Sequence, residues 1–165
     1  MQVHSEPDVV GLLEGLVASQ LPSPALEAWS SLLRAHATLV RQLEMDLERE
    51  TGLALADFDV LAQLALAGGE LRMTELAARA LISRSGMTRR VARLVDEGLV
   101  RRANTQADAR GVVVALTDAG LARLLETAPV HARGVAALFV ARLDDHELAV
   151  LKTAMDKVTV DCTFG

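Results

Sequence analysis

Aromatic residues are scarce in this sequence, which holds one Trp, three Phe and no Tyr among 165 residues. The apolar residues make up 51% of the chain, so a core must be built from Leu, Val and Ala. Such a core favours helices over an all-β sandwich, in which aromatic and β-branched residues predominate. The length and composition predict a globular chain that can bury a substantial core.

The sequence also lacks a second cysteine, so Cys162 cannot form an internal disulfide. Its first residues contain neither a basic segment nor a long apolar run, which argues against a signal peptide and a membrane span. We therefore expect a cytoplasmic protein without a membrane segment.

Motifs of catalysis and cofactor binding are missing too. The four His residues have no metal-ligand spacing, and no phosphate loop, dinucleotide motif or Ser/His/Asp set is recognisable. We expect no metal, no cofactor and no enzyme activity. An enzyme using Asp57, Asp59 or a His is an open alternative that would require a clustered acid–base pair in a pocket.

The net charge of −5 is unevenly distributed along the chain. Residues 72–110 hold nine Arg and four acidic residues, a net charge of +5. The remaining residues carry eight of the 17 basic and 18 of the 22 acidic residues, a net charge of −10. A basic middle within an acidic frame is typical of a module that faces phosphates, although a solvated charged surface would give the same count.

Apolar residues recur at helical spacing along most of the chain, and Pro or Gly residues separate the segments. The first five expected helices cover 8–20, 25–50, about 56 to Gly68-Gly69, 74–80 and 83–97. Ser83 is placed to cap the last of these, and Gly98 is placed to end it. Residues 99–103 and 112–116 are the predicted strands of a β-hairpin with a polar loop and a basic tip.

The helical period returns after the hairpin. Thr117 is placed to cap a helix in which Pro129 is expected to produce a kink or an interruption. Asp144 and Glu147 form a capping-box pair for the last helix. That helix is expected to bury four apolar side chains, namely Leu148, Leu151, Met155 and Val158.

This order of elements predicts a mainly α fold with a small β-hairpin wing, the winged helix-turn-helix. A helix fits the major groove of double-stranded DNA, and an adjacent hairpin can place Arg on phosphates or in the minor groove. On the helix at 83–97, Met87, Val91 and Leu94 share one face. The expected DNA-binding residues of this helix are Arg84, Ser85, Gly86, Thr88, Arg89 and Arg93.

Arg89 is the best candidate for a base contact, which contributes about 1–3 kcal/mol of discrimination between bases. Arg90 lies at the edge of the buried face. We expect Arg90 to form an ion pair with Asp59 that fixes the helix at 83–97, the recognition helix, against the neighbouring helices. A regulatory role of this ion pair is the alternative. A winged helix used only for protein contacts is the main competing function, and it would show no steep salt dependence with DNA.

Several motifs occur at a characteristic spacing. They include Glu75-Leu76-Ala77, the runs 82–89 and 94–102, and, most specifically, Asp108-Ala109-Arg110-Gly111 followed by Leu116-Thr117-Asp118-Ala119-Gly120. In these motifs the chain closely resembles the MarR family of bacterial transcriptional regulators. The resemblance covers nearly all of the chain from Ala25 to Val158.

The resemblance implies an obligate homodimer that binds a pseudo-palindromic operator and usually represses transcription. Thr88 and Arg89 would make the family's recognition-helix contacts, and Arg110 would enter the minor groove, oriented by Asp108. The domain division would be an N-terminal extension (1–24), a first dimerisation helix (25–52), the winged helix-turn-helix (53–116) and C-terminal dimerisation helices (117–165).

Members of this family often sense a small phenolic or anionic effector in a cleft beside the winged domain. A urate-responsive subgroup uses an Asp and two Arg at positions that match Asp59, Arg90 and Arg102. We add Trp29 and His36 to this candidate ligand set, although the subgroup's own Trp has no clear counterpart here. A purely structural ion pair between Asp59 and Arg90 is the alternative.

Overall fold

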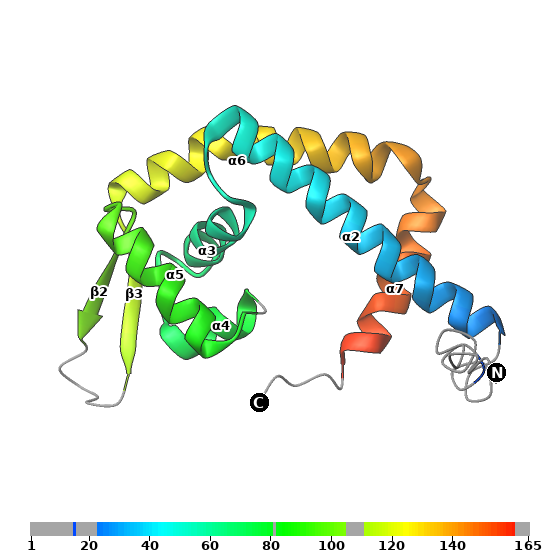
Figure 1. Cartoon of the computed structure of the whole chain (residues 1–165), viewed down its shortest axis with the longest axis horizontal. Helices are drawn as coiled ribbons and strands as arrows, with labels where there is room; N and C mark the ends of the chain where they lie inside the picture. The colour runs from blue at the N-terminus through cyan, green and yellow to red at the C-terminus, as the bar shows by residue number, and fades with distance from the viewer. Residues whose placement is uncertain (1–14, 16–22, 81, 105–110, 161–165) are drawn as a thin grey trace, which may run out of the picture. The chain divides into compact units, whose positions relative to one another are not determined.

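A computed structural model of the chain describes residues 15, 23–80, 82–104 and 111–160 (Figure 1). The helix expected at 8–20, apart from position 15, lies outside the described residues, as do the hairpin tip and Cys162. The chain divides into two compact units, residues 1–41 and residues 42–165. The boundary falls inside helix α2 (Ser23–Thr51). The presence of α2 confirms the helix expected at 25–50.

Within the first unit, α2 exposes its apolar side chains. No residue between 23 and 41 is buried, and Trp29 is 52% exposed. Leu33 and Val40 are exposed as well. Rows of large exposed apolar side chains are uncommon on protein surfaces. Where they occur, they often mark a surface that binds a partner.

The second unit contains the winged helix and the C-terminal helices (Figure 1). After α2 its elements are α3 (Leu55–Leu66), β1 (Glu70–Arg72), α4 (Met73–Arg79), α5 (Arg84–Asp96), β2 (Val100–Asn104), β3 (Val112–Leu116), α6 (Asp118–Leu138), a short 3-10 helix (Val140–Arg142) and α7 (Asp145–Thr159). The predicted helices of the winged domain and both hairpin strands are confirmed, with bounds that differ by no more than about two residues.

The three strands form an antiparallel sheet in the order β1-β3-β2, with β3 at its centre. Leu71 of β1 pairs with Val114, and Arg102 of β2 pairs with the same residue from the other side. Strand β1 is not predicted by the sequence pattern, because three residues are too few to show alternation.

The core lies where α3, α4 and α5 pack on this sheet. Its fully buried side chains come from α3, α4, α5, β2 and β3, with Leu47 added from the end of α2: Leu47, Val60, Leu61, Leu64, Leu76, Met87, Val91, Leu94, Val100 and Val114. Burying each Leu or Val of this kind contributes about 2 kcal/mol. The core therefore fixes the apolar face of α5 and leaves its opposite face outward.

Local signals determine where α5 begins and ends. The Ser83 side chain accepts a hydrogen bond from the backbone N–H of Gly86 at 3.2 Å, which confirms Ser83 as the N-cap. Gly98 follows the helix with a φ of +73°, a left-handed conformation that glycine adopts at low cost. The chain thus turns directly from α5 into β2.

Thr117 and Gly120 join the sheet to α6. The Thr117 hydroxyl donates to the carbonyl of Gly98 at 2.7 Å and accepts from the backbone N–H of Gly120 at 3.0 Å. A Cβ atom on Gly120 would lie 2.0 Å from the carbonyl oxygen of Leu99. The Leu-Thr-x-x-Gly motif is therefore a packing requirement, because only glycine lets α6 approach the turn before β2 this closely.

Two expectations for the C-terminal helices need correction. Of the two effects expected of Pro129, the interruption is wrong, because α6 is continuous from Asp118 to Leu138 with Pro129 inside it. The capping box of Asp144 and Glu147 is present, but α7 buries no residue. Val158 is 58% exposed, and the other members of its predicted buried stripe are only half-buried. The described part of a single chain offers α7 too little surface to cover that stripe.

One described segment, Asp118–Arg142, is long and apolar enough to cross a membrane by length and composition alone. This is weak evidence for a span, because helices of water-soluble proteins pass the same test. In this chain the segment contributes Leu124 to the core of the winged helix.

We predict that Gly120→Ala lowers the free energy of unfolding by about 2–3 kcal/mol, because the added methyl group meets a backbone carbonyl that cannot move aside. Gly134→Ala is the matched control. Its Cβ would lie 2.7 Å from the end of the flexible Leu43 side chain, so its cost should be smaller. Urea denaturation at a fixed protein concentration measures both. Equal stability of Gly120→Ala and the natural sequence would contradict this account.

Candidate nucleic-acid interface

The first two turns of α5 present a polar surface to solvent. Arg84, Ser85, Thr88 and Arg89 are exposed, whereas Met87 is completely buried. A Cβ atom on Gly86 would lie 3.0 Å from both Ile82 and Ser83, so glycine keeps this first turn compact. The exposed residues are hydrogen-bond donors and acceptors of the kind that recognise bases and phosphates.

Two cations on this surface have no partner among the described residues. Among the described residues, Arg84 and Arg89 have no side-chain hydrogen bond and no ion pair. The hydroxyl of Thr88 donates to the carbonyl of Arg84 at 2.9 Å, which leaves its lone pairs available as acceptors. The N-terminal half of α5 therefore offers two unpaired guanidinium groups on a rigid helix.

The hairpin adds positive charge beside α5. Arg101 and Arg102 are exposed on β2, and Arg102 Nη2 donates to the backbone carbonyl of Thr88 at 3.4 Å. The predicted wing residues Asp108 and Arg110 lie outside the described residues. The described base of the wing thus contacts the recognition helix directly.

Arg90 is paired with Asp57, not with the expected Asp59. Arg90 Nη1 donates to Oδ1 of Asp57 at 2.6 Å. Arg93 binds the same carboxylate, with Nη2 at 2.7 Å from Oδ1 and 2.5 Å from Oδ2. The Asp57 side chain is 6% exposed, so this carboxylate is buried beneath two arginines of α5.

The helical geometry of α3 explains why Arg90 pairs with Asp57 and not with Asp59. At 100° per residue, Asp57 falls on the same arc as the buried Phe58, Leu61 and Leu64, whereas Asp59 falls on the opposite side. A carboxylate within a buried arc requires cationic partners. A helical-wheel comparison of Asp57 with Asp59 would therefore have identified Asp57 as the buried acidic residue from the sequence.

Asp59 belongs to a different cluster, formed with His131 of α6 and Glu44 of α2. The pKa of the Asp59 carboxyl is raised, chiefly because its neighbours remove water from it. The charges of His131 and Arg90 act in the opposite direction, and Glu44 adds to the rise. The ring of His131 also stacks against Phe58, with the ring centroids 4.6 Å apart.

Two nitrogen atoms beside this cluster are unsatisfied. Among the described side chains, Arg90 Nε and His131 Nδ1 are buried without a hydrogen-bond partner. Buried polar atoms without partners are uncommon in folded proteins.

The candidate ligand residues do not all come together. Asp59 and Arg90 are within electrostatic reach of each other, but Arg102 contacts Thr88. Trp29 and His36 are exposed on the part of α2 that belongs to the first unit. Among the described residues, no group of three His, Cys, Asp or Glu side chains is arranged to hold a metal ion.

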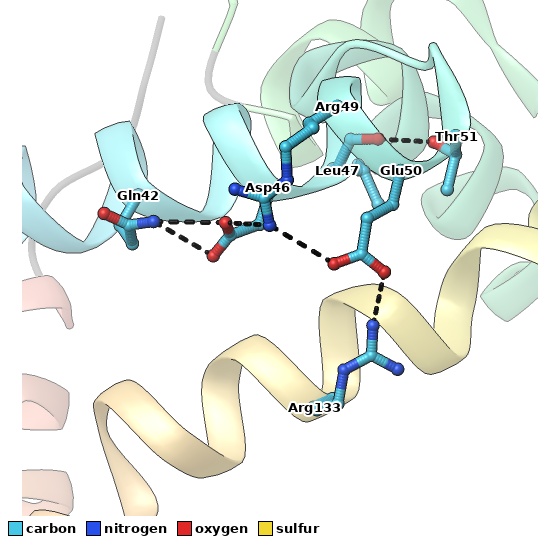
Figure 2. A network of polar contacts seen from close by, with 7 residues as sticks. All are labelled: Gln42, Asp46, Leu47, Arg49, Glu50, Thr51 and Arg133. Atoms are coloured by element: carbon cyan, nitrogen blue, oxygen red, sulfur yellow. Dashed lines mark hydrogen bonds and ion pairs between the residues drawn. The ribbon is translucent and has the colours of Figure 1, made fainter.

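A further polar network joins the end of α2 to α6 (Figure 2). Arg133 Nη2 donates to Glu50 at 2.5 Å, and Arg49 pairs with Asp46 at 2.9 Å. Gln42 donates to both oxygens of Asp46 at 3.1 Å. These residues border a cavity of about 230 Å³. Because two cations face two carboxylates here, the network has no net charge to attract nucleic acid, and we assign it to holding the two helices together.

A winged helix with exposed cations on one helix is typical of proteins that read double-stranded DNA with that helix in the major groove. A model of the MarR family matches residues 51–111, from the end of α2 into the hairpin. A search of curated proteins found no match.

Solved structures extend the similarity to most of the chain. Sco3205 from Streptomyces coelicolor, a MarR family regulator solved in complex with DNA, is 35% identical, with a TM-score of 0.79 over 84% of this chain and 91% of that one. AbsC, a MarR family regulator from the same organism, is 31% identical, with a TM-score of 0.78 over 84% of this chain and 94% of that one. A mutant MarR from E. coli complexed with operator DNA is 26% identical, with a TM-score of 0.71 over 87% of this chain and 97% of that one.

The chain therefore belongs to the MarR family, and it is a DNA-binding transcriptional regulator with a winged-helix fold. Regulators of this family are generally not enzymes.

The raised pKa of Asp59 leads to a prediction about pH. Its ionised form is less favourable in the folded chain than in the unfolded chain, so Asp59→Asn should stabilise the fold near pH 7. As the pH falls through the raised pKa, the natural folded protein takes up a proton, and the advantage of the variant should disappear. Urea midpoints at about pH 7 and about pH 4 measure the difference. A variant that is less stable at neutral pH would show that the partners of Asp59 outweigh its loss of hydration.

Proposed function

We propose that this protein is a sequence-specific regulator that binds a pseudo-palindromic operator as a homodimer and represses transcription. The observation that carries the proposal is the exposed N-terminal half of α5, where Arg84 and Arg89 have no partner in the described part of the chain and the helix is anchored by the core. Two related regulators solved in complex with DNA support DNA binding by this chain.

In this proposal Arg89 contacts a base edge in the major groove, and Thr88 and Ser85 contribute polar contacts beside it. Arg84, at the start of the helix, binds phosphate. Gly86 lets the backbone come close to the duplex. The sequence-predicted Arg110, oriented by Asp108, extends the contact into the minor groove.

Uncovered apolar surface supports the homodimer. In the first unit, Trp29 and Leu33 are exposed on α2. In the second unit, α7 exposes Val158 and leaves Leu148 and Leu151 only half-buried. A second copy of the chain would cover these helices, and two recognition helices related by a two-fold axis would match a pseudo-palindromic site. Such a regulator acts in the cytoplasm.

Release by a small molecule is a further part of the proposal. The unpaired Arg90 Nε and His131 Nδ1 are donors or acceptors near Asp59, and they suit a small anionic or phenolic effector. Because Arg90 is on the recognition helix, an effector bound there would act on α5 directly.

We predict that Arg89→Ala weakens binding to DNA taken from upstream of the protein's own gene by about 10- to 100-fold, and that it binds random duplexes with little change. Fluorescence anisotropy at several salt concentrations measures both affinities. Lys152→Gln on α7, which removes one exposed positive charge, is the control and should bind like the natural protein. If the natural protein bound no duplex better than an acidic control protein does, the proposal would be wrong. A winged helix that is used only for contacts with other proteins would then be the better interpretation.

We also predict that Leu151→Glu prevents dimer formation, because it places a charge in the apolar stripe of α7. Thr153→Glu, on the opposite face of the same helix, is the matched control and should remain dimeric. Analytical ultracentrifugation distinguishes the two. A dimer of undiminished stability in Leu151→Glu would exclude this face of α7 from the interface.

A further inference from the structure

We propose that Asp57 determines DNA specificity by holding Arg90 and Arg93 away from the DNA backbone, so that α5 binds through Arg84 and Arg89 alone. This inference rests on the proposed function. In this inference Asp57 positions the two arginines and does not itself contact DNA. Arg93, which the sequence analysis places among the DNA-binding residues, does not contact DNA either.

The geometry of the carboxylate supports this role. From the described residues Asp57 accepts three hydrogen bonds, and all three come from α5. Its Oδ2 is bound by Arg93 alone among the described residues, at 2.5 Å. Arg93 could therefore move to a phosphate only by leaving a buried, charged oxygen without a partner.

Burial decides which anion Arg93 prefers. Its side chain is 52% exposed, so it is accessible enough to reach a phosphate, whereas the Asp57 side chain is 6% exposed. A buried charge that loses its partner is strongly unfavourable. A phosphate contact at the surface is screened by salt and replaces hydration that is already favourable. The intramolecular pair is therefore the stronger one.

The two arginines are also one helical turn apart, so one carboxylate anchors α5 at two points. This restrains the rotation of the helix about its axis and fixes the direction in which Arg89 points. It also removes one net positive charge from the surface of the winged domain that binds DNA. Both effects favour base recognition over attraction to any phosphate backbone.

The first test compares Arg93→Gln with Arg89→Gln on random duplex and on the upstream DNA, by anisotropy over a range of salt concentrations. Arg93→Gln should bind both DNAs within about twofold of the natural protein and with the same salt slope. Arg89→Gln should lose affinity for the upstream DNA. Arg93→Gln still leaves Asp57 with Arg90, so this variant should fold.

The second test uses Asp57→Asn, which removes the buried carboxylate from both arginines and, among the described residues, leaves Arg93 only a 3.9 Å contact with Glu97. Its affinity for random duplex should rise several-fold, and its salt slope should steepen by about one per protomer. Its preference for the upstream DNA over random duplex should fall. Adding Arg93→Gln to Asp57→Asn should restore the shallower slope, which a merely structural role of Asp57 would not explain.

The outcomes separate this inference from the proposed function. If the natural protein binds DNA but Arg93→Gln loses affinity and slope as Arg89→Gln does, the inference is wrong and the function stands. A folded Asp57→Asn with an unchanged slope would also overturn the inference. If circular dichroism shows that Asp57→Asn is unfolded, the comparison of Arg93→Gln with Arg89→Gln decides alone. Absence of any DNA binding by the natural protein would overturn both.

Discussion

The carboxylate of Asp57 lies almost out of contact with water, and the two guanidinium groups that balance it both belong to α5. A buried charge of this kind is tolerated only while its partners remain in place. The constraint is therefore mutual. Rotation of α5 would leave the buried Asp57 carboxylate without its cationic partners, and an outward turn of Asp57 would break its contacts with both arginines. The apolar contacts of Met87, Val91 and Leu94 hold the helix to the core, and Asp57 sets its orientation.

The rest of the winged domain supports this arrangement. Ser83 and Gly98 fix where the recognition helix begins and ends, and Thr117 with Gly120 ties the sheet to α6. At the opposite side of α3, Asp59 and His131 connect the winged domain to α6. Arg90 takes part in both charged clusters, so it links the orientation of α5 to the surroundings of Asp59.

Much of this architecture follows from local sequence signals. Capping residues, left-handed glycines and a change of period from helix to strand predict α5, the hairpin and the capping box of α7. The rest depends on contacts distant in sequence. The partner of Arg90 is on α3, 33 residues away, and β1 is identifiable only by its pairing with β3. The apolar stripe on α7 predicts a burial that the structure does not show, because the described part of one chain has no surface that covers it.

A crystal structure of the protein bound to DNA from upstream of its own gene tests the central claim most directly. We expect that the guanidinium of Arg89 lies against a base edge, while Arg90 and Arg93 remain hydrogen-bonded to Asp57. A structure in which Arg93 has left Asp57 and binds a phosphate would contradict the claim that this carboxylate decides which cations of α5 are available to DNA.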